Sequence, residues 1–169
     1  MLEKASGSMN TYEFAITMEQ DGEQYYRKQA EINKDNSLHS VCLILANEEV
    51  HHAQILISRR NHTDYEMPKS DILMNAKNVF SGISDIKMDL KPIPSQLDFY
   101  RIASDLELRS IALYKELRSK AEDPKDIELF EYLIGQEKNH FDVLDNLASL
   151  LRQTEEWVES PEFGFRKDF

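Results

Sequence analysis

Two Glu-x-x-His motifs in this chain lie 88 residues apart. The first consists of Glu49 and His52, within EVHH, and the second consists of Glu137 and His140, within EKNH. Residues three positions apart share one face of a helix, so each motif can direct a carboxylate and an imidazole at one point. One such motif is a weak signal in a Glu-rich chain, and the repeat is what constrains the fold.

The 88-residue spacing extends to other positions, so the two halves of the chain repeat each other. Glu19 lies 30 residues before Glu49, and Glu107 lies 30 residues before Glu137. Further pairs with the same separation are Tyr26 and Tyr114, Leu45 and Leu133, and Leu56 and Leu144. Each half therefore supplies one carboxylate from one helix and a Glu-x-x-His motif from the next.

Apolar residues at three- and four-residue steps predict four long helices over residues 10–33, 37–60, 95–121 and 123–151. Short turns make the first helix antiparallel to the second and the third antiparallel to the fourth. Residues 61–94, with a short helical pattern at 72–80 and two late prolines, form a connection long enough to run the length of the bundle. The predicted fold is an all-α, ferritin-like four-helix bundle with one long crossover.

The predicted bundle occupies residues 10–152 and is flanked by two short segments. Residues 1–9, with a small Ser/Gly stretch, are predicted to be a loose lead-in. Residues 153–169 carry more aromatic side chains than a free tail would. These are Trp157, Phe163, Phe165 and Phe169. We expect this tail to dock on the bundle or on a partner subunit.

Two hairpins related by a pseudo-twofold axis would bring four carboxylates and two imidazoles into the core. Buried carboxylates are costly unless protons or cations neutralise them, and two divalent ions supply four positive charges. Oxygen-rich ligation with one imidazole per metal favours iron, with manganese as the alternative, over structural zinc. The predicted metal ligands are Glu19, Glu49, His52, Glu107, Glu137 and His140.

Within this set, Glu19 and Glu107 are predicted to be terminal ligands, and Glu49 and Glu137 are predicted to be bridges. In the alternative interpretation, the Glu side chains reach solvent and the His side chains cap backbone groups in a simple bundle. We expect Tyr26 and Tyr114 to fill the core, and a role as redox-active or hydrogen-bonding neighbours of the metals is the alternative for them.

The composition excludes several classes of protein. Hydrophobic residues make up 41% and charged residues 30%, with five Gly and five Pro, which is typical of long amphipathic helices. A net charge of -11 disfavours nucleic-acid binding. Cys42 is alone, so neither an internal disulfide nor a Cys-ligated metal is expected. No segment predicts a signal peptide or a membrane span, so we expect a soluble cytoplasmic protein.

Four segments resemble the rubrerythrin branch of the ferritin-like superfamily: MEQDGEQYY at 18–26, NEEVHHAQIL at 47–56, LELRSIALY at 106–114 and GQEKNHFDVL at 135–144. The resemblance implies two irons held by the six ligands named above. This chain differs from rubrerythrins in two respects. Rubrerythrins carry a four-Cys rubredoxin domain, and they typically have a further Glu three residues after the helix ligand that corresponds to Glu107, where this chain has Ser110.

The resemblance favours an oxidoreductase that reduces hydrogen peroxide or dioxygen with electrons from an external donor, such as a rubredoxin or a reductase. Ser110 weakens the link to the ligand exchange that accompanies peroxide reduction in the family. One alternative is a ferritin-like ferroxidase that stores or delivers iron, and another is a non-catalytic metal-binding bundle. We expect a homodimer.

Overall fold

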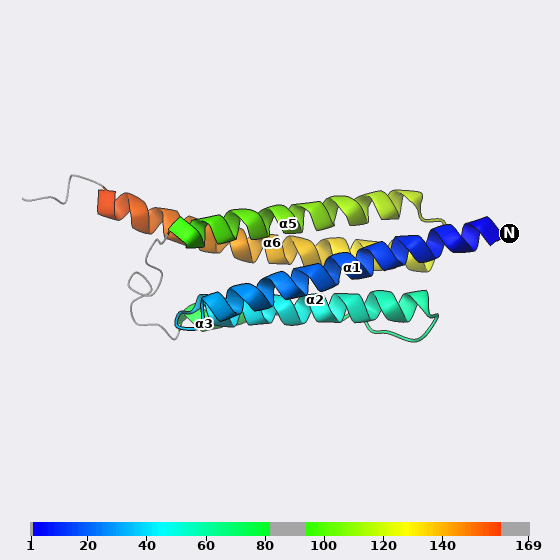
Figure 1. Cartoon of the computed structure of the whole chain (residues 1–169), viewed down its shortest axis with the longest axis horizontal. Helices are drawn as coiled ribbons and strands as arrows, with labels where there is room; N and C mark the ends of the chain where they lie inside the picture. The colour runs from blue at the N-terminus through cyan, green and yellow to red at the C-terminus, as the bar shows by residue number, and fades with distance from the viewer. Residues whose placement is uncertain (1, 82–93, 160–169) are drawn as a thin grey trace, which may run out of the picture.

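The computed structural model describes residues 2–81 and 94–159, and in these ranges the chain forms five helices and no strand. They are α1 (Leu2–Ile32), α2 (Leu38–Arg60), α3 (Ile72–Ser81), α5 (Pro94–Lys120) and α6 (Pro124–Glu159). The four long helices lie side by side in a bundle, as Figure 1 shows. The predicted all-α four-helix architecture is therefore confirmed.

Two antiparallel hairpins make up the bundle, because α1 packs along α2 and α5 packs along α6 (Figure 1). In the turn before α2, the Asn36 side-chain oxygen accepts a hydrogen bond from the Leu38 N–H at 2.9 Å. Before α6, Asp123 Oδ1 accepts one from the Lys125 N–H at 2.9 Å, and Pro124 occupies the first helical position. These local hydrogen bonds satisfy backbone N–H groups where α2 and α6 begin.

The connection between the hairpins contains α3, which packs against α2 and α6 at one end of the bundle (Figure 1). Ile72 anchors this short helix because its side chain is buried. The predicted short helix at 72–80 is thus confirmed. Among the described helices, none is both long and apolar enough to cross a membrane.

Two helices are longer than predicted. α1 begins at Leu2 rather than Asn10, so the prediction of a loose lead-in over residues 1–9 is wrong for the described residues. This segment contains no Pro, and extending an existing helix costs far less than starting one. α6 continues to Glu159, beyond the predicted end near Leu151, through a polar stretch of good helix formers. The rest of the predicted aromatic tail lies outside the described residues.

The apolar core consists of two clusters, one towards each end of the bundle. One cluster includes Tyr26, Leu45 and Leu144, and the other includes Leu56 and Leu133. Along every long helix, the predicted metal ligands fall between the residues of these two clusters. The bundle therefore encloses one polar layer between two apolar ones.

Candidate metal centre

All six predicted ligands lie in the polar layer, and each of the four long helices contributes to it. α1 and α5 each supply one carboxylate, and α2 and α6 each supply a Glu-x-x-His pair. No one of the six residues is more than 4% exposed. Those residues are Glu19, Glu49, His52, Glu107, Glu137 and His140. The alternative of glutamates that reach solvent is therefore excluded.

The first ligand group surrounds the Nδ1 atom of His52. This nitrogen lies 3.5 Å from Glu19 Oε2, 3.6 Å from Glu49 Oε2 and 3.2 Å from Glu137 Oε1. One ligand atom from each of these four residues falls within 4.8 Å of the others. The group can therefore enclose one cation.

The second group is the counterpart of the first in the other half of the chain. His140 Nδ1 lies 3.3 Å from Glu49 Oε1, 3.6 Å from Glu107 Oε2 and 3.3 Å from Glu137 Oε2. The imidazole rings of His52 and His140 are nearly parallel, with centroids 5.3 Å apart. Glu49 and Glu137 belong to both groups, so the geometry suits two cations with these two carboxylates between them.

The buried polar atoms of the layer support this fit. Both ring nitrogens of His52 and His140, and both carboxylate oxygens of Glu137, have no hydrogen-bond partner among the described residues. Leaving a buried polar atom unsatisfied costs about 1–3 kcal/mol, and native proteins rarely leave so many together. Bound cations would satisfy these atoms, so the residues fit a dinuclear metal site.

The carboxylates influence one another's protonation. Burial, together with the charges of Glu19 and Glu107, raises the pKa of Glu49 to about 8. Burial would also raise the pKa of Glu19, but a hydrogen bond from Glu49 and the charge of His52 lower it to about 2. Burial and the neighbouring carboxylates hold the pKa of Glu137 well above its usual range. Without metal, the layer therefore retains protons that cations would displace.

Two tyrosines connect the halves of the chain across the site. The hydroxyl of Tyr26, on α1, donates a hydrogen bond to Glu107 Oε1 on α5. The hydroxyl of Tyr114, on α5, donates one to Glu19 Oε1 on α1. Both tyrosines are fully buried, so they fill the core and also hold the two predicted terminal carboxylates.

Sequence reasoning missed Glu48, which lies on the outer side of the site. Its Oε2 atom is 3.8 Å from His140 Nε2 and accepts a hydrogen bond from the Ser70 hydroxyl at 3.4 Å. A carboxylate on the outer nitrogen of a metal-bound His orients the ring and increases its basicity. In the other half the corresponding residue is Gln136, so the repeat gave no signal for this position.

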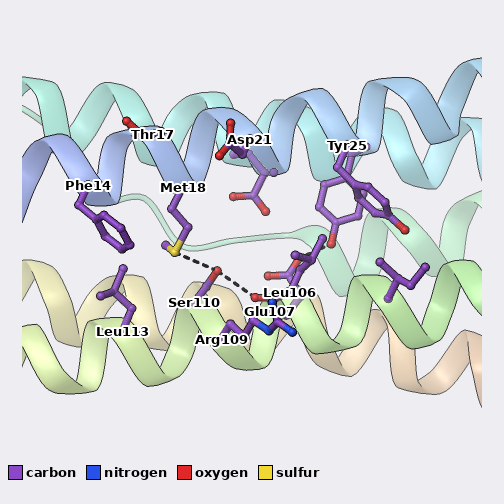
Figure 2. Close-up of a pocket in the computed structure, with 14 residues that line it drawn as sticks. Phe14, Thr17, Met18, Asp21, Tyr25, Leu106, Glu107, Arg109, Ser110 and Leu113 are labelled. Carbon is purple, nitrogen blue, oxygen red and sulfur yellow. Dashed lines mark hydrogen bonds between the residues drawn. The ribbon is translucent and has the colours of Figure 1, made fainter.

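A pocket of about 580 Å³ opens between α1 and α5, and Glu49 and Glu107 are among its lining residues. Figure 2 shows Glu107 in this pocket. Gly22 lines it, and a Cβ atom added there would lie 3.5 Å from the Glu49 side chain. Its counterpart in the repeat is Ser110, whose hydroxyl bonds to the Leu106 carbonyl at 3.1 Å (Figure 2). Small residues at both positions leave the carboxylate side of the site accessible.

Comparison with known proteins agrees with this geometry. No curated protein and no solved structure matches the chain. The family model described as rubrerythrin matches residues 11–148. The match includes every residue of the buried Glu/His cluster, on all four long helices. The chain therefore belongs to the rubrerythrin family.

Proposed function

We propose that this protein is a di-iron oxidoreductase that reduces hydrogen peroxide, or dioxygen, with electrons from an external donor. The observation that carries the proposal is the pair of buried ligand groups that share Glu49 and Glu137. Two irons held there would supply two electrons to the oxidant at one place. Peroxide is the preferred oxidant because the family resemblance points to it.

The side chains around the site have separate roles in this proposal. Glu19 and Glu107 would be terminal ligands, and the tyrosine hydroxyls on their Oε1 atoms would fix their orientation. Glu49 and Glu137 would bridge the irons. The pocket between α1 and α5 would admit the oxidant from the carboxylate side, because Glu49 and Glu107 line it and neither histidine does.

The electron donor in this proposal is a separate protein, such as a rubredoxin or a reductase. Cys42 is the chain's single cysteine, so the chain holds no four-Cys iron site of its own. We further propose a homodimer in a reducing cytoplasm. The buried, uncrosslinked thiol of Cys42 is compatible with such a compartment.

The first test is anaerobic loading with Fe(II), followed by rapid mixing with peroxide or with dissolved oxygen. We expect binding to stop at two irons per chain, because the cluster has two ligand groups. We also expect the diferric absorption to appear much faster with peroxide than with oxygen. Preference for oxygen with continued iron uptake would instead identify an iron oxidase. This second outcome is worth measuring because Ser110 stands where rubrerythrins typically have a further Glu, which weakens the link to peroxide reduction.

The double variant Glu49→Gln, Glu137→Gln tests the ligand assignment. Replacing both shared carboxylates removes two charges from the buried layer, so we expect iron binding and the oxidant reaction to be lost. The matched control is Glu13→Gln, Glu131→Gln, which makes the same charge change at exposed positions of α1 and α6 and should keep two irons. Survival of metal binding in the first variant would show that the assignment is wrong.

A further inference from the structure

A row of stacked rings leads from the metal centre towards one end of the bundle. Tyr114, which donates to Glu19, stacks on Phe130 with ring centroids 6.2 Å apart. Phe130 stacks on Tyr12 with centroids 6.0 Å apart. The hydroxyl of Tyr12 donates to Asp126 Oδ1, at the start of α6. We call Tyr114, Phe130 and Tyr12 the Tyr12 row.

The other half of the chain contains a second row that leads from Glu107. Tyr26 contacts Tyr25 with centroids 5.4 Å apart, Tyr25 stacks on Phe99 at 6.1 Å, and Phe99 contacts Tyr100 at 5.0 Å. Tyr100 lies 88 residues after Tyr12, so the two rows end at equivalent positions of the repeat. We call this second series the Tyr100 row.

The two rows differ in what their terminal hydroxyls contact. Tyr12 faces the carboxylate of Asp126, which Arg59 also holds through its Nε atom at 2.8 Å. The Tyr100 hydroxyl is buried and has no hydrogen-bond partner among the described residues. Tyr25, within the second row, donates to the Phe99 carbonyl at 3.5 Å, and a carbonyl is a poor proton acceptor.

This difference decides which tyrosine can lose an electron. A tyrosine that gives up an electron becomes a very strong acid, so oxidation is favourable only where a base takes the phenolic proton. Tyr26 and Tyr114 face Glu107 and Glu19, but those carboxylates would be committed to the metals once the site is filled. Asp126 is not one of the six proposed metal ligands. Its side chain is 22% exposed, so a proton received there can pass to solvent.

We propose that Tyr12 is a one-electron donor to the metal centre through Phe130 and Tyr114, with Asp126 as the acceptor of its proton. The inference rests on the proposed di-iron function. Dioxygen needs four electrons and four protons to become two water molecules. Two Fe(II) ions held by the six residues would supply two electrons, the external donor would supply a third and Tyr12 the fourth, and the four protons would come from solvent. The phenoxyl radical left at Tyr12 would then be reduced by the donor at that end of the bundle.

The test uses the whole protein loaded anaerobically with two Fe(II) per chain, with one further equivalent of Fe(II) as the source of the third electron. After rapid mixing with dissolved oxygen and freezing, electron paramagnetic resonance should show a tyrosyl radical. We expect Tyr12→Phe to lose the radical. The matched control Tyr100→Phe removes the equivalent hydroxyl of the other row and should retain it.

Two further variants separate electron transfer from folding. Phe130→Leu removes the ring between Tyr114 and Tyr12, and Asp126→Asn removes the proton acceptor but leaves every ring in place. Each should lose most of the radical while still binding two irons and developing the diferric absorption. A structural role alone would change the melting temperature and not the radical.

The outcomes distinguish this inference from the function on which it rests. If the wild-type protein binds two irons and becomes diferric without a radical, the Tyr12 donor role is overturned and the proposed function stands. The donor role is also overturned if Tyr100→Phe removes the radical and Tyr12→Phe does not. If no iron binds, the proposed function fails and the donor role fails with it.

Discussion

Gly22 shows how one missing side chain shapes the site. It lies inside α1, where Gly is less favourable than Ala by about 0.5–1 kcal/mol. An added Cβ would make an ordinary van der Waals contact with Glu49 at 3.5 Å, so packing does not require Gly at this position. What Gly22 preserves is open space in the pocket above that carboxylate.

Two substitutions at this position should therefore have different effects. Gly22→Ala should stabilise the protein by about 0.5–1 kcal/mol because it removes the helix cost of Gly. Gly22→Leu should keep iron binding but slow the reaction with oxidant, since its side chain would extend into the pocket. Thermal unfolding and stopped-flow absorption measure the two effects.

The control for this pair is Gly135, in α6, where an added Cβ meets nothing within 4 Å. Gly135→Ala should give a similar gain in stability, and Gly135→Leu should leave the oxidant reaction unchanged. An equal loss of reaction rate in the two Leu variants would contradict the role given to the pocket.

The sequence predicts the six ligands because symmetry-related positions repeat at a fixed spacing on helix faces. It does not predict which tyrosine contacts which carboxylate, because that depends on how α1 and α5 are aligned across the bundle. Tyr26 therefore looked like core filler, although its hydroxyl holds Glu107. Glu48 was missed because its counterpart, Gln136, breaks the repeat.

At the scale of the helices, Arg59 links the end of α2 to the start of α6. Its guanidinium donates at 2.8 Å to Asp126 and at 2.8 Å to Asp123, and Asp126 also accepts from Tyr12 of α1. The Arg59 side chain is 11% exposed and that of Asp126 is 22% exposed, so water poorly replaces the bond between them when one partner is removed. Three helices are thus joined at one end of the bundle.

Arg59→Met should therefore destabilise the protein by about 1 kcal/mol, chiefly because it removes the partly buried ion pair with Asp126 while keeping much of the side-chain volume. Denaturant unfolding of the metal-free protein measures the loss. The neighbouring variant Arg60→Met is the control, because Arg60 donates to Asn61 beside it and not to α6. Equal losses in the two variants would show that the link between helices contributes nothing.

The start of α6 was predicted well, whereas the start of α1 and the end of α6 were not. Asp123 and Pro124 mark the start of α6, and the structure agrees. The first residues of α1 contain Ser and Gly, which suggested a loose segment, yet no Pro prevents the helix from extending to Leu2. Composition alone does not show where a helix that is already formed will end.

At the scale of the whole molecule, the metal-free protein should lose stability as pH rises. In the folded state the pKa of Glu49 is about 8, against an ordinary value of 4.5, because of burial and the charges of Glu19 and Glu107. Between these values the folded chain keeps a proton that the unfolded chain releases. This stabilising contribution is complete below about pH 4.5 and is lost as pH approaches 8, so the melting temperature should fall across that window.

Bound metal should reverse this dependence, because the cations displace the protons of the buried layer and bind more tightly as pH rises. Melting curves of the metal-free and iron-loaded proteins between about pH 5 and pH 8 provide the comparison. Glu49→Gln should flatten the metal-free curve, since an amide has no proton to release. A metal-free melting temperature that rises with pH in this window would contradict the pKa raised by burial.

The crossed hydrogen bonds of Tyr26 and Tyr114 mean that neither hairpin completes its own half of the centre. Each of these two tyrosines donates to a carboxylate of the other hairpin, so this pair of hydrogen bonds is reciprocal. A single hairpin of this kind is self-complementary, and two identical copies could build the whole centre about a true twofold axis. If the sequence of such a self-pairing hairpin were duplicated and the two copies joined, the resulting chain would carry a repeat like the 88-residue one seen here.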